Sequence, residues 1–185
     1  MRKNLGPKSL ICPEPVLIIA TYNEDGSANA MNAAWGGVSD YNEIIISVSK
    51  HKTTENIKKT KAFTVSFATR EQVVSCDYVG IVSANKVKDK LNKAKWHVSK
   101  SENVNAPLID ELPVALECKL KKYDEKAGHL IGTIVNVSVD SSVLTRGKVD
   151  YKKFHPIIFD GLNNTYMALG DKIANAFSVG KKLIK

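Results

Sequence analysis

The chain has 185 residues, with 27 Lys or Arg against 19 Asp or Glu, so its formal net charge is +8. Its 43% hydrophobic content, 6 Pro and 11 Gly exclude a disordered or collagen-like chain. A chain of this length buries roughly 70% of its unfolded surface and needs no metal or disulfide to fold, so we predict one domain over residues 1–185.

Alternating hydrophobicity predicts a chain dominated by strands, with short helices between them. The Asp25-Gly26 pair is a hairpin signal that joins the first two strands, and residues 124–128 break a later hairpin. Thr53 is placed to N-cap the first helix. In chain order, we predict strands at 16–22, 27–32 and 43–49, a helix at 54–61, a strand at 62–68, a helix at 71–79, loops and short helical pieces at 81–110, and strands at 114–123, 129–140, 157–159 and 166–169.

Strands that follow one another through hairpin turns predict a mainly β fold, an antiparallel barrel carrying peripheral helices. Gly36-Gly37 interrupts the strand pattern and is too short to count as a phosphate cradle. The sequence contains neither a GxGxxG nor a GxxxxGK[ST] motif, so a doubly wound nucleotide-binding sheet is not expected.

Two features predict a cytoplasmic protein with no membrane partner. The longest unbroken apolar stretch, residues 16–20, is far shorter than the ~20 residues of a spanning helix, and the basic residues 1–3 are not followed by the apolar core of a secretory signal. Cys12, Cys76 and Cys118 form no CxxC pair, as expected in a reducing compartment. The His and Cys residues do not cluster at ligand spacing, so no metal site is expected.

The positive charge favours anions without indicating a nucleic-acid reader. Only Arg2, Arg70 and Arg146 are Arg, whereas base contacts and tight phosphate forks favour that residue. We interpret the Lys-rich run at residues 86–95 as a solvated loop or helix face. A basic polyanion-binding module is an alternative function, but the aromatic-rich basic strand that stacking requires is absent, and we expect no nucleic-acid partner.

Two polar stretches flank the strand predicted at residues 43–49. Residues 29–35 (NAMNAAW) have small side chains that let a flat heteroaromatic ligand approach the backbone, with Met31 and Trp35 for apolar contact. The alternative is a strand edge with a core Trp. Residues 47–54 (SVSKHKTT) offer hydroxyls, two Lys and a helix N-terminus to a phosphate. The alternative here is a solvated turn.

Several short motifs occur together in a characteristic order over nearly the whole chain. They are Pro13-Glu14-Pro15-Val16, the strand ending in Thr21, Gly26, Asn29-Ala30-Met31, Trp35, the SxxKTTxN pattern from Ser49 to Asn56, Asp77-Tyr78-Val79-Gly80, Leu116-Glu117-Cys118, and His129 with Gly132. In these motifs the chain resembles the flavin reductase-like, FMN-binding split-barrel proteins, which include flavoredoxin.

The resemblance implies a six-stranded split β-barrel that works as a homodimer and holds FMN non-covalently near the subunit interface. It places the isoalloxazine and ribityl chain beside Asn29, Ala30, Met31, Asn32 and Trp35, largely through backbone groups. It places the ribityl and phosphate along Ser47, Val48 and Ser49, and it closes on the phosphate with Lys52, Thr53 and Thr54, beside which His51 stands.

The chemistry in this interpretation belongs to the flavin, which the protein holds open to a hydride donor. The resemblance implies NADH or NADPH as that donor. It also implies that His129 helps to seat the nicotinamide or to order the site. The alternative is that His129 has a purely structural role. A flavoredoxin-like electron carrier, reduced by a redox protein partner, is the alternative to an NAD(P)H-dependent flavin reductase. Cys118 is expected in the core, whereas Cys76 is a candidate for a place near the flavin.

Overall fold

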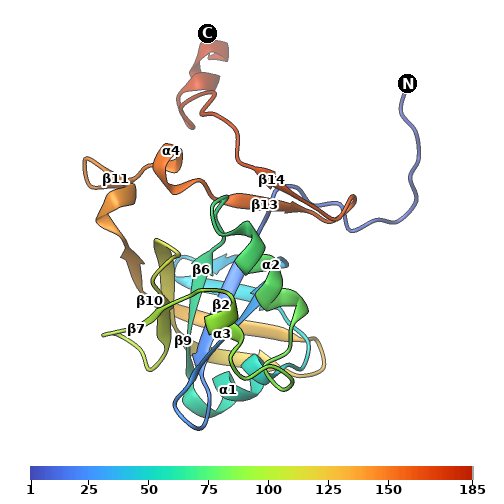
Figure 1. The fold of residues 1–185 in the computed structure, drawn as a ribbon. Coiled ribbons are helices and arrows are strands. Elements are labelled where there is room, and N and C mark those ends of the chain that lie inside the picture. The colour runs from blue at the N-terminus through green and yellow to red at the C-terminus, as the bar shows by residue number, and fades with distance from the viewer. Residues whose placement is uncertain (185) are drawn as a thin grey trace.

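The computed structural model describes residues 1–184 and contains one large antiparallel sheet flanked by short helices (Figure 1). The sheet has seven strands in the order β3-β2-β6-β9-β10-β5-β4. Their bounds are β2 Leu17–Tyr22, β3 Ala28–Ala33, β4 Gly36–Asp40, β5 Glu43–Ser47, β6 Ala62–Phe67, β9 Val114–Asp124 and β10 His129–Val139. Every neighbouring pair is antiparallel, which confirms the predicted mainly β class.

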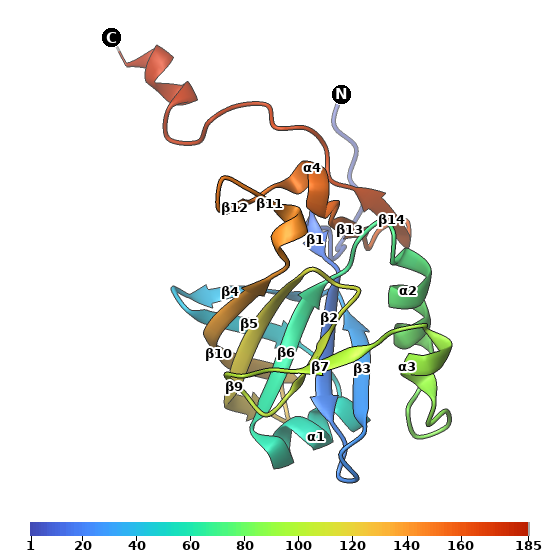
Figure 2. The same ribbon diagram turned by 60° about the vertical axis from the view of Figure 1, so that its left-hand side comes forward.

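Helices and small sheets surround this main sheet, and α2 and α3 lie along β3 (Figure 2). The helices are α1 Lys52–Thr60, α2 Val73–Ile81, α3 Lys90–Lys93 and α4 Tyr151–Phe154, with short 3-10 turns at Ser141–Val143 and Val179–Leu183. The remaining strands are β1 Glu14–Pro15, β7 Val98–Lys100, β8 Pro107–Ile109, β11 Leu144–Thr145, β12 Lys148–Val149, β13 Ile157–Asp160 and β14 Thr165–Ala168.

The core lies on both faces of β2, which explains why this strand is continuously apolar. Leu17 and Ile19 pack with Phe63 on one face, whereas Ile18 packs with Trp96 in a separate cluster on the other face. Successive side chains of a strand point to opposite faces, so a strand buried on both faces carries no polar alternation. The apolar run at residues 16–22 therefore marks a central strand.

The structure corrects three local predictions. The main sheet has seven strands where the expected barrel had six, because Gly36–Asp40, interpreted as an interruption, pairs with β5 as an edge strand. Helix α1 begins at Lys52 with His51 as its N-cap residue, so the N-cap assigned to Thr53 was wrong. A short β7–β8 hairpin also forms within residues 81–110, where only loops and helical pieces were predicted.

A buried carboxylate ties the loop around residues 101–106 to the sheet. Glu117 on β9 is 2% exposed and accepts hydrogen bonds from Ser101, from Asn103 at 2.9 Å and from Asn136 at 2.7 Å. Burial opposes its ionisation, but these hydrogen bonds together lower the pKa of Glu117. The network therefore holds a charged side chain inside the fold, where it is fully paired.

The chain ends project from a second sheet, in which β13 pairs with β1 on one side and β14 on the other. The hydroxyl of Tyr166 on β14 donates to Asp77 of α2 at 2.7 Å, which fastens this sheet to the body. Beyond it, the C-terminal segment extends away from the main sheet (Figures 1 and 2). Among residues 1–184, none of the helices combines the length and the apolar character needed to cross a membrane.

Candidate functional site

A cavity of about 650 Å³, here called the large cavity, opens where several connections of the chain meet. Its walls come from β3 and the turn into β4, the β5–α1 connection, the β9–β10 turn and the β13–β14 hairpin. The lining residues are Ser9, Met31, Asn32, Ala33, Ala34, Trp35, Ser47, Val48, Ser49, Lys50, His51, Tyr123, Glu125, Lys126, Ala127, Gly128, Phe159, Gly161 and Asn164.

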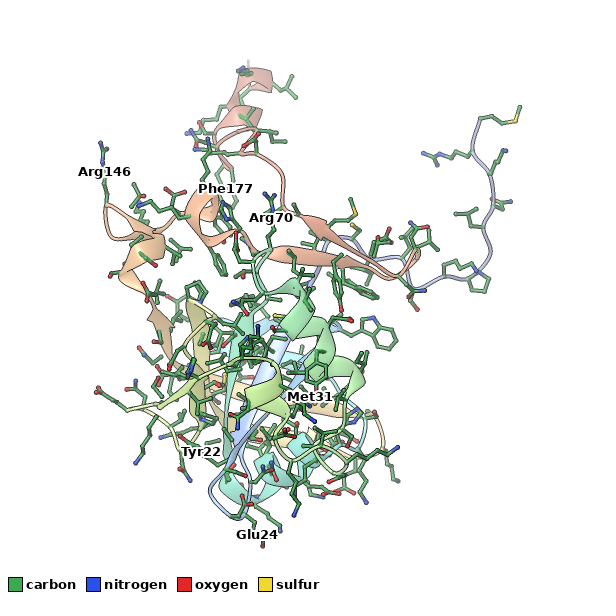
Figure 3. The ribbon with its side chains drawn as sticks, viewed as in Figure 1. Tyr22, Glu24, Met31, Arg70, Arg146 and Phe177 are labelled. Carbon is green, nitrogen blue, oxygen red and sulfur yellow. The ribbon has the colours of Figure 1, made fainter. Side chains whose placement is uncertain are left out.

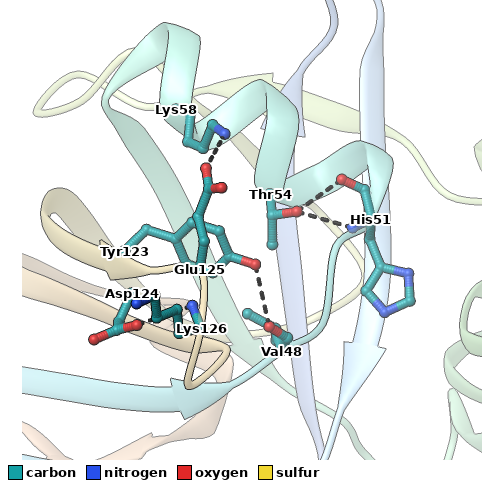
Figure 4. Close-up of polar contacts among 8 residues, drawn as sticks. All are labelled: Val48, His51, Thr54, Lys58, Tyr123, Asp124, Glu125 and Lys126. Carbon is teal, nitrogen blue, oxygen red and sulfur yellow. Dashed lines mark hydrogen bonds and ion pairs between the residues drawn. The ribbon is translucent and has the colours of Figure 1, made fainter.

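Backbone hydrogen bonds hold the β5–α1 connection against two other walls. The Ser47 N–H donates to the Trp35 carbonyl at 2.7 Å, and the Val48 N–H donates to the Gly128 carbonyl at 2.7 Å. The Tyr123 hydroxyl donates to the Val48 carbonyl at 3.4 Å (Figure 4). Gly128 has a φ of 68°, and a Cβ there would lie 3.1 Å from the Val48 oxygen. The close approach of this turn therefore favours glycine.

Contacts near both ends of α1 hold this helix in position. Thr54 Oγ1 accepts from the His51 N–H at 2.9 Å and donates to the His51 carbonyl at 2.8 Å (Figure 4). Ser49 Oγ and His51 Nε2 lie 2.9 Å apart. Lys58, further along α1, pairs with Glu125 of the β9–β10 turn at 2.5 Å. The N-terminus of α1, whose free N–H groups favour an anion, is thereby held in one place.

A second cavity of about 280 Å³, here called the small cavity, adjoins the large one, because Met31, Asn32 and His51 line both. The remaining walls come from β3, the start of α1, the end of α2 and the first residue of α3. These further lining residues are Asn29, Lys52, Thr53, Val79, Gly80, Ile81, Val82, Ser83, Ala84 and Lys90. The two cavities form one elongated site.

Two asparagines of β3 supply fixed polar groups to this site. Asn29 Nδ2 donates to Thr53 Oγ1 at 2.9 Å, and Asn32 Nδ2 donates to the Cys76 carbonyl at 3.0 Å. Within residues 1–184, no donor reaches the buried Oδ1 atom of Asn29. Buried acceptors are almost always paired, so Asn29 presents an unmet acceptor that a hydroxyl of a ligand can satisfy.

Lys90 brings a buried positive charge to the small cavity. It is 4% exposed, and no carboxylate of the described chain pairs with it. Burial lowers the pKa of Lys90 to about 8, because a charge removed from water without a partner is disfavoured. An anionic ligand group in this cavity would supply the missing partner.

The chemistry of the lining side chains changes from the large cavity to the small one. Met31, with Trp35 of the large cavity, offers apolar surface to a flat ring. Lys52, Thr53 and Lys90 of the small cavity offer cations and a hydroxyl to an anion. The arrangement suits an elongated ligand with an aromatic ring system at one end and a phosphate at the other.

The structure brings ten of the predicted binding residues to this site. Those that line one or both cavities are Asn29, Met31, Asn32, Trp35, Ser47, Val48, Ser49, His51, Lys52 and Thr53. Ala30 and Thr54 line neither cavity, because the Ala30 side chain packs in the core and the Thr54 hydroxyl serves the His51 backbone. Their part in binding stays a prediction.

His129 opens β10, is exposed, and stands opposite Ser47 of β5. Its neighbour Gly128 lines the large cavity, but His129 itself lines neither cavity. Its catalytic role stays a prediction.

Sequence reasoning missed three parts of the site. These are Lys90, the wall that α2 gives to the small cavity, and the wall that the β9–β10 turn gives to the large cavity. The run at residues 86–95 was interpreted as solvated, yet Lys90 within it is buried. The spacing of Val87, Leu91 and Ala94 is a signal that could have found it. Apolar residues at i, i+4 and i+7 mark a face turned to the core, and Lys90 adjoins that face.

The two internal cysteines are buried thiols. Cys118 is fully buried in the core, as predicted. Burial raises the pKa of Cys76 and of Cys118 to about 12, so both remain protonated near neutral pH. The Cys76 carbonyl contacts Asn32, so this residue touches the site through its backbone while its thiol stays inert.

The model of the flavin reductase like domain matches residues 9–157, and the chain belongs to this FMN-binding family. An uncharacterized protein of Aquifex aeolicus (strain VF5) is 30% identical over 159 residues, which cover 80% of this chain and 81% of that protein.

Among solved structures, flavoredoxin of Desulfovibrio vulgaris (Miyazaki F) is 37% identical and superposes with a TM-score of 0.92 over 98% of this chain and all of its own. Flavoredoxin from Methanosarcina acetivorans is 28% identical, with a TM-score of 0.88 over 99% of this chain and all of its own. An FMN-binding domain of a flavin reductases-like enzyme from Shewanella baltica OS155, 19% identical, has a TM-score of 0.79 over 88% of this chain and 89% of its own. The fold is thus the expected split barrel.

The residues of the two cavities fit FMN. The unpaired Asn29 Oδ1 suits a ribityl hydroxyl, and the unpaired Lys90 ammonium suits the phosphate. The apolar surface of Met31 and Trp35 suits the ring system. The fit thus gives partners to two polar groups of the site that the described chain leaves unpaired.

Proposed function

We propose that this protein is an FMN-binding oxidoreductase that takes hydride from NADH or NADPH and passes the electrons onward. The observation that carries the proposal is the buried, unpaired Lys90 in a small cavity that continues from a larger, partly apolar one. Bound FMN supplies hydride acceptance and electron transfer. The chain supplies binding, orientation and access.

The residues divide this work by position. Lys52, Thr53 and Lys90 hold the phosphate at the start of α1, where helix N–H groups add to the positive potential. Asn29 accepts from the ribityl chain, and Asn32, which is fixed on the Cys76 carbonyl, orients the ligand between the two cavities. Hydride transfer requires no side-chain acid or base, so the site needs no nearby titrating group.

The large cavity offers the route by which a hydride donor would approach the ring. Its volume of about 650 Å³ is within the range of pockets that hold whole small ligands. Trp35, which is 59% exposed, stands at this opening and offers stacking surface to an incoming nicotinamide. His129 enters the proposal only as a residue that helps to order the donor.

An electron carrier reduced by a protein partner is a second candidate. The observation that favours it is the similarity to two flavoredoxins, each matched over its whole length. In this alternative the same cavities hold FMN, and the exposed opening at Trp35 meets a redox protein in place of a nicotinamide.

A homodimer completes the proposal. Its support is the C-terminal arm, residues 170–184, which is exposed along its whole length and carries Ile173 and Phe177, each 99% exposed. Large apolar side chains at such exposure are typical of a surface that another chain covers.

The test is an anaerobic titration of the FMN-loaded protein, followed by the flavin absorption bands. Bleaching by NADH or NADPH at catalytic rates supports the reductase and names its donor. Bands that persist with both nicotinamides, but bleach with dithionite or a reduced redox protein, would replace the reductase with the carrier.

A further inference from the structure

A third, smaller pocket holds a carboxylate that the chain leaves without a partner. The pocket measures about 340 Å³, and Ile11, Pro13, Pro15 and Trp35 give it apolar walls. Glu14 also lines it, is 8% exposed, and has a buried Oε2 atom that no donor within residues 1–184 reaches. We call it the Glu14 pocket. A buried carboxylate calls for a cation or a strong hydrogen-bond donor.

The Glu14 pocket belongs to the neighbourhood of the proposed flavin site. Ser9, Ala34 and Trp35 line both this pocket and the large cavity. A Cβ on Gly161, another residue of the large cavity, would lie 3.6 Å from Glu14 Oε2. Whatever fills the Glu14 pocket therefore also borders the opening of the large cavity.

The C-terminal arm has the composition that complements this pocket. It carries the exposed apolar residues Ile173 and Phe177, with Leu183 at 88% and Ile184 at 78% exposure. Between and beside them lie three cations, Lys172, Lys181 and Lys182. An arm of lysines among large apolar residues matches apolar walls around a single carboxylate.

The arm of the same chain departs from the edge of the small sheet opposite to the edge that carries Glu14, so it does not reach this pocket directly. In the small sheet, β13 lies between β1, which carries Glu14, and β14, from which the arm departs. The arm then extends away from the main sheet, with Phe177 far from Met31 (Figure 3). The match to the Desulfovibrio vulgaris flavoredoxin, at a TM-score of 0.92 over 98% of this chain, extends into the arm, so its course recurs in a relative.

We infer that the C-terminal arm of a second copy fills the Glu14 pocket, with an arm lysine paired to Glu14 and apolar arm residues against Ile11 and Pro13. This inference rests on the proposed homodimer and adds a partner residue beside each flavin site. The opening of the large cavity is then completed by the other chain, so binding of flavin and pairing of the chains support each other.

Zero-length cross-linking tests the inference on the full chain. Unlabelled and 15N-labelled protein are refolded together in equal amounts, treated with a water-soluble carbodiimide, digested and analysed by mass spectrometry. The expected product is an amide between Glu14 and Lys172, Lys181 or Lys182, with mixed labels that prove a link between chains. The Glu14→Gln variant should give none of this product, because a carbodiimide activates carboxyl groups and not amides.

The inference would be overturned by links from Glu14 that are confined to one chain, by links only to lysines outside the arm, or by no lysine link at all. Protection of Glu14 by added NADH in place of the arm would also reject it, because the occupant would then be a small molecule. The cross-link needs no flavin, whereas FMN binding is read from absorbance. A failure of the arm contact is therefore distinguishable from a failure of the proposed oxidoreductase.

Discussion

Replacing Lys90 by Met should weaken FMN binding and stabilise the apoprotein, because the buried ammonium favours the bound phosphate but destabilises the fold without it. Met has a similar length and no charge, so it fills the same space in the small cavity. A charge-assisted hydrogen bond contributes about 1.5 to 3 kcal/mol, which corresponds to a roughly 10- to 150-fold change in affinity. We expect FMN to bind Lys90→Met more weakly by a factor in that range.

The apoprotein should respond in the opposite direction. Burial lowers the pKa of Lys90 from 10.5 to about 8, and each pKa unit corresponds to about 1.4 kcal/mol. The unfolded chain holds this proton more tightly, so the free energy of unfolding rises as the pH increases from about 8 to 10.5. At pH 7 the charged Lys90 thus costs roughly 3 kcal/mol, and Lys90→Met should be more stable by up to that amount.

Flavin fluorescence quenching measures the affinity, and urea unfolding of the apoprotein at pH 7 and near pH 10.5 measures the stability. The stability gain of Lys90→Met should shrink at the higher pH, where the wild-type lysine is neutral in the folded state and about half deprotonated in the unfolded state. Lys86→Met is the matched control, because Lys86 belongs to the same run and is exposed. Equal FMN affinity of Lys90→Met and the wild type, or an equal loss in Lys86→Met, would refute the reasoning.

Three further predictions concern the site and its supports. Gly80→Ala should weaken FMN binding several-fold, since its Cβ would lie 2.9 Å from Asn32 Cβ, whereas Gly37→Ala, with open space around it, should bind FMN normally; calorimetric titration compares the two. Glu117→Gln should lose about 2 to 3 kcal/mol of stability at pH 7, because an amide donor replaces an acceptor of three hydrogen bonds. Because the pKa of Glu117 is lowered in the folded state, its contribution to stability is complete above about pH 4.5 and is lost as the pH falls through the folded pKa. The free energies of unfolding of Glu117→Gln and the wild type, measured by chemical denaturation, should therefore converge in acid. A difference that stays constant with pH would contradict this expectation. In the native protein, Ellman's reagent should modify only Cys12, which is exposed, and rapid reaction of either buried cysteine would contradict the assigned burial.

Strands were predictable where the chain alternates or is buried on both faces. The β9–β10 hairpin follows from residues 124–128 between two alternating segments, and the β2–β3 hairpin follows from Asp25-Gly26. By contrast, β4 begins with two glycines and is an exposed edge strand, so neither composition nor burial distinguishes it from a loop. Its partner β5 follows directly in the chain, but an exposed strand that opens with two glycines lacks the β-branched and aromatic residues that mark strands in a sequence.

The site was predictable where one segment carries several of its residues. The β5–α1 connection and β3 each supply consecutive lining residues, so a short motif reveals them. Lys90 reaches the small cavity from α3, and the packing of that helix buries it while lysines such as Lys86 stay exposed. The unmet acceptor on Glu14 likewise arises from the pairing of β1 with β13, which brings together residues far apart in the chain.

The most direct test of the central claim is a pair of equilibrium titrations, one with FMN and one with riboflavin, each followed by flavin fluorescence. The two ligands share the ring and the ribityl chain and differ in the phosphate, which the account assigns to Lys52, Thr53 and Lys90. It predicts stoichiometric quenching of FMN, and binding of riboflavin that is at least tenfold weaker. Absence of quenching, or equal affinity for the two ligands, would contradict it.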